Sequence, residues 1–301
     1  MAEKYYTAAS GNWSTAANWN GGTKPTSSDD VYANGKTITI DEDVTVLSLR
    51  TTAGTTAVAG GNFTCSTNRT ITVSGSGIVA GSSECLTFSG TTGSIVGNVT
   101  GGSGGNARGV RNSSSGTLTI TGNVTGGSGG TGTGHGAYNG TGTLAIVGNV
   151  TGGSDGSSGV YGFSAGTLTV TGNVTGGSAS SSYGVRVPSG TLTVTGNVTG
   201  GSNSTAFGVF NEGSGTTTVN GNLTPATSCA VGIDGSGRIT VTGNLNSVST
   251  GVAPIGSAGI RFTIDPSATL THAYRVQNGG SIGSERTLST STGGGSYVIG
   301  G

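Results

Sequence analysis

Carboxylates are few and scattered between residues 90 and 262 of this chain. Glycoside hydrolysis needs two carboxylates that converge on one bond, but the acids of this stretch are only Asp155, Glu212 and Asp234. They fall in different repeats at different repeat positions, which leaves open only a pair formed across a subunit boundary. His135 and His272 have no cysteine or carboxylate neighbour that would complete a catalytic triad. The sequence therefore predicts a protein that is not an enzyme.

Ligands for a metal ion or a cofactor are equally scarce. Glycine-rich calcium coils repeat Gly-Gly-x-Gly-x-Asp, whereas the nearest match here is the single stretch Gly152-Gly153-Ser154-Asp155. A hard cation needs several carboxylates. The widely spaced Cys65, Cys85 and Cys229 fit no disulfide or metal motif, and we expect them to be small buried hydrophobes. We therefore predict no metal and no cofactor.

Large side chains recur at one position of the repeat, directly after a short step of glycine and an apolar residue. Tyr, Phe and Arg are favoured in protein interfaces, so this stripe is the best candidate for an oligomer or partner interface. Scattered exposed aromatics are also normal on monomers, and that interpretation stays open. One repeat has Asp234 at this position. With the aromatic residues near the two chain ends, the candidate interface residues are Trp13, Trp19, Arg111, Tyr138, Tyr161, Arg186, Phe210, Arg261 and Tyr297.

A six-residue motif, Gly-Asn-Val-Thr-Gly-Gly, organises the chain. The steps between its copies are 22 to 26 residues, which indicates a stacked repeat architecture. The full copies are Gly97–Gly102, Gly122–Gly127, Gly148–Gly153, Gly172–Gly177 and Gly196–Gly201, and two shorter copies begin at Gly221 and Gly243.

The asparagine of this motif is expected to have a structural role. Stacked side-chain amides can hydrogen-bond from coil to coil, as in the asparagine ladders of cross-β structures. We therefore predict an asparagine stack made of Asn98, Asn123, Asn149, Asn173, Asn197, Asn222 and Asn244.

Three short strands are expected in each repeat. In the copy that begins at Gly166, Leu168 and Val170 would point inward, and Thr167, Thr169 and Thr171 would point outward. Glycine supplies the corners between strands. This pattern predicts an all-β fold, a right-handed single-stranded parallel β-helix of about nine coils with about 24 residues each. The outward threonines resemble the ice-binding face of some antifreeze proteins, which makes ice binding a remote alternative function.

The chain divides into three expected parts. Residues 1–35, which hold both tryptophans, are predicted to be an N-terminal cap or docking segment that covers the open end of the first coil. Residues 36–265 are the predicted parallel β-helix. Residues 266–301 leave the repeat and are predicted to be a C-terminal cap or oligomerisation segment.

Composition and charge exclude several function classes. The 12 basic and 12 acidic residues give no net charge and no basic stripe, so we expect no nucleic-acid binding. No apolar run is long enough for a membrane-spanning helix, and we expect no membrane insertion. The start at Met1–Tyr6 does not read as a secretory signal, which favours assembly in a cytoplasm.

The opening segment carries a resemblance to a known group of proteins. Gly11-Asn12-Trp13-Ser14-Thr15-Ala16-Ala17-Asn18-Trp19 leads to Pro25, then to Asp29-Asp30-Val31 and Gly35-Lys36-Thr37-Ile38-Thr39-Ile40. It resembles the first segment of β-helix proteins of tailed bacteriophages and of some bacterial surface proteins. The resemblance covers about 30 residues of the chain. It implies an appendage or decoration of the virion, often trimeric.

The expected function follows from the resemblance and from the absence of catalytic groups. It is a non-enzymatic virion structural protein, a rigid rod displayed on the capsid as a decoration or head fibre, assembled in the host cytoplasm. The alternative is a tail fibre or tailspike that binds a receptor or glycan. The expected partners are two further copies of the chain in a homotrimer, other virion proteins of capsid or tail, and a host-surface glycan.

Overall fold

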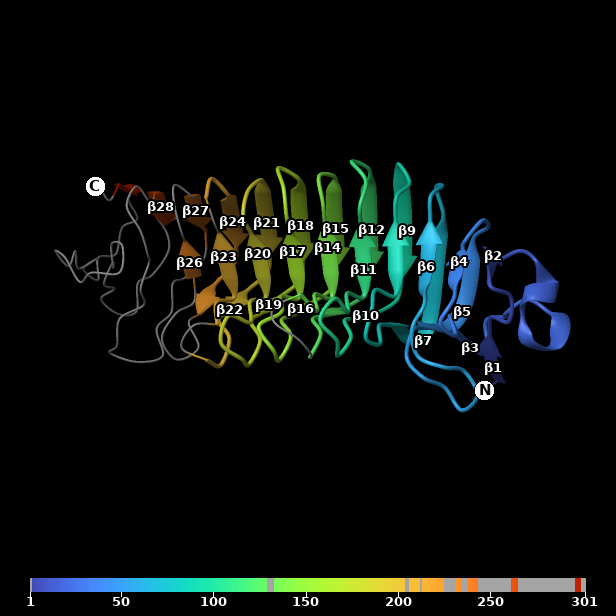
Figure 1. Ribbon diagram of the computed structural model, residues 1–301. Coiled ribbons are helices and arrows are strands. Elements are labelled where there is room, and N and C mark those ends of the chain that lie inside the picture. The colour runs from blue at the N-terminus through green and yellow to red at the C-terminus, as the bar shows by residue number, and fades with distance from the viewer. Residues whose placement is uncertain are drawn as a thin grey trace.

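The computed structural model describes residues 2–128, 133–203, 206–211, 213–224, 231–233, 238–242, 261–264 and 296–298. In this part the chain is all-β apart from two single-turn 3-10 helices, η1 (Ala16–Asn18) and η2 (Asn20–Gly22). Parallel strands stack into a β-solenoid of about nine turns, seen from the side in Figure 1. The predicted parallel β-helix is confirmed, whereas its hand stays a prediction.

Each complete coil contributes one strand to each of three faces. The strands of the first face are β9 (Thr92–Val96), β12 (Thr117–Thr121), β15 (Thr143–Val147), β18 (Thr167–Thr171), β21 (Thr191–Thr195), β24 (Thr216–Asn220), β27 (Arg238–Val241) and β28 (Arg261–Ile264). The strands of the second face are β1 (Ala2–Tyr5), β3 (Asp29–Tyr32), β10 (Val99–Thr100), β13 (Val124–Thr125), β16 (Val150–Thr151), β19 (Val174–Thr175), β22 (Val198–Thr199) and β25 (Leu223–Thr224).

The third face is a separate sheet. Its strands are β2 (Ser10–Asn12), β4 (Thr37–Thr39), β6 (Asn62–Cys65), β8 (Leu86–Phe88), β11 (Val110–Asn112), β14 (Ala137–Asn139), β17 (Val160–Gly162), β20 (Val185–Val187), β23 (Val209–Asn211) and β26 (Val231–Ile233). The first two faces are joined in early coils, because the long strands β5 (Val44–Arg50) and β7 (Thr70–Val79) run through both.

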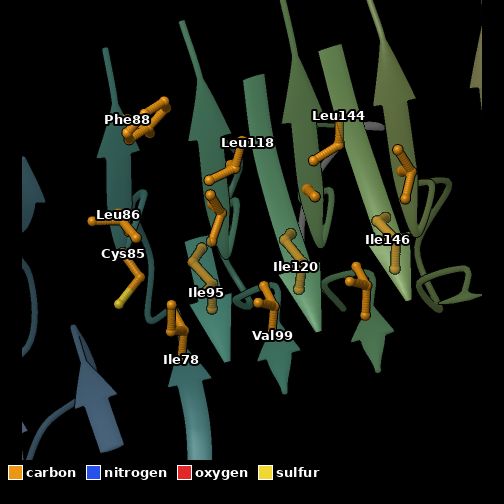
Figure 2. Packing of buried hydrophobic residues seen from close by; sticks show 14 of the residues in the cluster. Ile78, Cys85, Leu86, Phe88, Ile95, Val99, Leu118, Ile120, Leu144 and Ile146 are labelled. Atoms are coloured by element: carbon orange, nitrogen blue, oxygen red, sulfur yellow. The ribbon is translucent and has the colours of Figure 1, made fainter. Parts of the chain in front are cut away.

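Alternating side chains build the core. In β18 the inward Leu168 and Val170 are buried, while Thr167 and Thr171 are exposed. Their register partners on the next coil are again Leu192 and Val194, so identical positions stack in columns. Figure 2 shows Leu118 and Ile120 beside Leu144 and Ile146 of the following coil. Each buried aliphatic side chain of this kind contributes about 1.5–3 kcal/mol, and no coil can bury its set alone.

The glycine that opens the repeated motif forms the corner between the first and second faces. Gly122, Gly148 and Gly172 have φ angles of +154°, +152° and +147°, a region that side chains disfavour. A Cβ at Gly148 would also overlap the carbonyl oxygen of Gly122 on the coil below. The motif therefore needs glycine for both backbone angle and coil spacing.

The boundary predicted between a cap at 1–35 and the helix at 36 is wrong. Strands β1 and β3 pair in parallel with each other, β3 pairs with β5, and β2 pairs with β4. The sheets therefore begin at Ala2, and only the excursion between β2 and β3, with η1 and η2, lies outside them. In that excursion the indole Nε1–H of Trp19 donates to the Trp13 carbonyl oxygen at 2.9 Å.

Only one strand of the predicted segment 266–301 is described, and it lies beside the last strand of the first face. Strand β28 pairs in parallel with β27, and β29 (Ser296–Val298) pairs antiparallel with β28. The end of the chain thus returns to its own last described coil. The rest of the predicted segment 266–301 lies outside the described residues, as do Asn244, Asp234 and Cys229.

Candidate binding surface

Five of the predicted interface residues form one column on the third face. Each is the central residue of a three-residue strand whose outer residues are buried. The register pairs them from coil to coil. The residues of this column, named the outer column, are Arg111, Tyr138, Tyr161, Arg186 and Phe210. The sequence placed them correctly, while their role as an interface stays a prediction.

The other candidate interface residues do not belong to the outer column. Trp13 and Trp19 are 2% and 1% exposed because they pack on each other, with ring centroids 4.8 Å apart, so neither can line an interface. Arg261 begins β28 and pairs with Arg238 on the first face. Tyr297 lies in β29, opposite Phe262. Phe210 pairs with Gly232 of the next coil.

A second column that the sequence analysis missed lies beside the first. It consists of the residues three positions before the outer column, and the signal was the repeated spacing x-Gly-apolar-x. The residues of this upstream column are Arg108, His135, Ser158, Tyr183 and Phe207. From His135 onward their backbone carbonyls accept the glycine N–H of the preceding coil, for example Gly109 N–H to His135 O at 3.1 Å, and the Arg108 carbonyl accepts the Cys85 N–H at 3.0 Å. The repeat therefore fixes both columns with equal regularity.

Ring and guanidinium groups of the two columns contact one another. The Arg108 guanidinium lies 4.5 Å from the Tyr138 ring centroid, and that of Arg186 lies 5.2 Å from the Tyr161 ring. Tyr183 stacks on Phe210 at 4.7 Å between ring centroids. Such cation–π and aromatic contacts contribute about 0.5–2 kcal/mol each. The two columns thus form one cluster of aromatic and cationic side chains, whose outer column faces away from the core.

His135 is the buried centre of this cluster. It is 2% exposed, stacks on Tyr161 at 4.6 Å, and accepts the Ser158 backbone N–H at Nδ1 over 3.1 Å. Burial, and then the positive charges of Arg108 and Arg186, lower the pKa of His135 to about 3. The imidazole is therefore neutral in the folded protein at pH 5 and above.

This neutral histidine predicts a loss of stability in mild acid. An unfolded histidine has a pKa of about 6.5 and takes up a proton in mild acid, whereas the folded His135 stays neutral. The free energy of unfolding should therefore fall by about 2 kcal/mol by pH 5. Urea unfolding at pH 7 and pH 5 measures this loss, and His135→Gln should remove most of the pH difference. Most carboxylates titrate below the range from pH 5 to pH 7, so they contribute little to this difference. An equal pH difference in both proteins would contradict the assignment.

A polar hollow of about 410 Å³ lies at the N-terminal end of the two columns. Glu84 contacts Arg108 directly and lies 3.6 Å from Arg111, measured from Oε1 to Nη1. Thr87 donates to Glu84 Oε2 at 3.1 Å, and Asn62 Nδ2 donates to the Thr87 hydroxyl at 2.9 Å. The Glu84 carboxylate thus lies close to the guanidinium groups of both Arg108 and Arg111.

The predicted asparagine stack is present, but its hydrogen bonds differ from those expected. Each side-chain oxygen accepts the backbone N–H of the next asparagine, from Asn98 to Asn123 at 2.9 Å and onward to Asn222. Each of these five bonds joins a side-chain oxygen to a backbone N–H of the next coil. A second, buried pair went unpredicted: Asn112 Nδ2 donates to Asn139 Oδ1 at 2.9 Å.

The outward threonines are more regular on the second face than on the first. On the first face the column of Thr121 is broken by Val147 and ends at Asn220. On the second face one threonine per coil continues in register, as Thr100, Thr125, Thr151, Thr175, Thr199 and Thr224. Threonine is a good exposed strand residue in any sheet, so this ladder is consistent with a purely structural role.

Two further findings concern the described residues alone. No three side chains of His, Cys, Asp or Glu in that part come together in a way that could hold a metal ion. Neither short helix there has the length and apolar character needed to cross a bilayer.

Comparison of the chain with protein-family models, with curated proteins and with solved structures gives no match.

Proposed function

We propose that the chain is a non-enzymatic structural protein of a tailed-bacteriophage virion, a rigid β-helical rod displayed on the capsid surface. A β-solenoid is compatible with a fibre or a tailspike-like repeat protein. The phage assignment is supported by the opening segment, whose resemblance runs from Trp13 to Ile40. The tryptophans that carry the resemblance have a structural role here, since they fill the first end of the rod.

Continuity of the coil stack is the observation that carries the proposal. The third face runs without a break from β2 to β26, and each coil adds about 4.8 Å to the length. Each inner coil of the described part shares its core and its backbone hydrogen bonds with both neighbours, so no such coil opens without losing contacts to two others. A stiff rod of this kind suits an element that projects from a particle.

Self-association belongs to the same proposal. The outer column and its aromatic neighbours offer Tyr, Phe and Arg, which interfaces favour, and Phe163 is 58% exposed at their edge. We place the contacts of a homotrimer, and those with other virion proteins, on exposed positions of this kind.

Quantitative mass spectrometry of gradient-purified phage particles tests the function. A copy number comparable with that of the capsid protein supports a capsid decoration or head fibre. A copy number similar to that of tail proteins supports the alternative, a tail fibre or tailspike. Absence of the chain from purified particles, with abundant chain in the lysate, overturns the virion assignment.

A further inference from the structure

The hollow beside Arg108 and Arg111 contains more positive than negative charge. Glu84 is the acidic residue among its lining residues, and it faces two guanidinium groups. The Arg111 side chain is 42% exposed, so part of its guanidinium faces solvent. About one positive charge is therefore left for an anion, which suits one carboxylate better than a chain of phosphates.

The polar network around the hollow is not saturated. Nε of Arg108, Nε of Arg111 and Oδ1 of Asn62 are buried and have no hydrogen-bond partner among the described residues. Buried polar groups are normally paired. All three atoms are closed to solvent, so a ligand in the hollow would contact the exposed part of the Arg111 guanidinium and not these atoms.

The size and chemistry of the hollow narrow the choice of ligand further. Its volume of about 410 Å³ suits a ligand of one or two rings. Ser83, Asn62 and Asn106 line it with hydroxyl and amide groups, which both donate and accept. The Tyr138 ring lies behind both guanidinium groups, with centroid distances of 4.5 and 5.9 Å, and holds them in place.

We propose that this hollow, formed by Asn62, Glu84, Arg108 and Arg111, binds a carboxylate-bearing sugar of an acidic polysaccharide. The carboxylate would pair with the exposed side of Arg111 and with Arg108, and the ring hydroxyls would meet the serine and asparagine side chains. The inference does not depend on where the protein is displayed, since it rests on the hollow alone.

Calorimetric titration of the full chain tests this site. The probes are a galacturonic acid trisaccharide, a neutral galactose trisaccharide of equal length, and sodium sulfate. We expect saturable binding of the acidic trisaccharide, with at least tenfold weaker binding of the other two, because a charge-assisted pair is lost in the neutral sugar and the hydroxyl contacts are lost in sulfate.

Three variants locate the binding. Arg111→Gln should weaken it by about tenfold or more, and Glu84→Gln should strengthen it, because a competing carboxylate is removed. Lys24→Gln removes the same charge in an exposed pair with Glu42 and should leave binding unchanged. Unchanged circular dichroism and melting temperature verify that each variant is folded.

Several results would overturn the proposal. They are no saturable binding of the acidic trisaccharide, equal affinity for the neutral one, or a response of Arg111→Gln that matches Lys24→Gln. Equal binding of sulfate means a simple anion site and rejects the sugar. Weaker binding by a folded Glu84→Gln contradicts the charge balance assigned to the hollow.

Discussion

Replacement of Gly102 by alanine is expected to destabilise the protein by about 3 kcal/mol or more. Gly102 lies in the turn that follows β10 and is buried between coils. A Cβ there would overlap both the Gly81 carbonyl oxygen and the Ala107 side chain. The Gly81 oxygen accepts the Ser103 N–H, and the Gly102 oxygen accepts the Ser128 N–H, so the turn cannot move without breaking hydrogen bonds to both neighbouring coils.

The same turn supplies a matched control. Gly105 lies three residues further on, is exposed, and has no atom within 4 Å of an added Cβ. Gly105→Ala should therefore change stability by no more than about 0.5 kcal/mol. Urea unfolding followed by circular dichroism compares the two variants. Similar midpoints for both would show that coil spacing at this turn is not the constraint we assign to it.

Replacement of Trp19 by alanine is expected to cost about 3–5 kcal/mol, the usual range for a large buried aromatic. Trp19 is 1% exposed and packs edge-on against Tyr6 and Trp13, with ring centroids 5.0 and 4.8 Å away. Its loss also leaves the Trp13 carbonyl oxygen without its indole donor. Because these rings cover the first coils, the variant should also expose strand edges and aggregate more readily.

Phe163→Ala is the control variant, because it also removes a large aromatic side chain. Phe163 is 58% exposed, and its ring centroid lies 6.1 Å from that of Tyr138 and 6.0 Å from that of Tyr161. Phe163→Ala should cost about 1 kcal/mol or less. Thermal unfolding and light scattering of both variants measure stability and aggregation. A Trp19→Ala protein as stable and as soluble as Phe163→Ala would contradict the capping role.

Most of the solenoid was predictable because its sequence repeats. The alternation of Leu168 and Val170 with threonines fixes which side of each strand is buried, and the same alternation in neighbouring repeats fixes the register. Glycine at the corner identifies where one face ends. Local pattern and coil stacking therefore lead to the same fold.

Features that depend on non-repeating segments were harder to predict. The tryptophans suggested a docking surface because large side chains are common in interfaces, but burial depends on how the excursion folds back on Tyr6. The placement of Arg261 followed a short Gly-Ile step, whereas pairing of Ile239 with Phe262 and of Val241 with Ile264 puts β28 on the first face. A step of one glycine and one apolar residue is too short to show to which face a strand belongs.

The candidate hollow had no sequence signal of its own. Arg108 and Arg111 belong to one turn and strand, but Glu84 and Asn62 come from the two preceding coils. Their contacts arise only because successive third-face strands lie side by side in register. The repeat spacing predicts which coils are neighbours. Before residue 90 the repeats are degenerate, so the sequence does not show which polar residues of those coils come into contact.

Disulfide trapping tests the register of the stack, on which the faces, the columns and the hollow all depend. Exposed Thr171 and Thr195 are register partners, so their Cα atoms lie about 4.8 Å apart, within the range of a disulfide. In a background with Cys229 replaced by serine, the pair Thr171→Cys and Thr195→Cys should oxidise within one chain, as peptide mapping can detect. The pair Thr171→Cys and Thr193→Cys, about 8 Å apart, should not. Equal cross-linking of both pairs, or of neither, would contradict the stacked register.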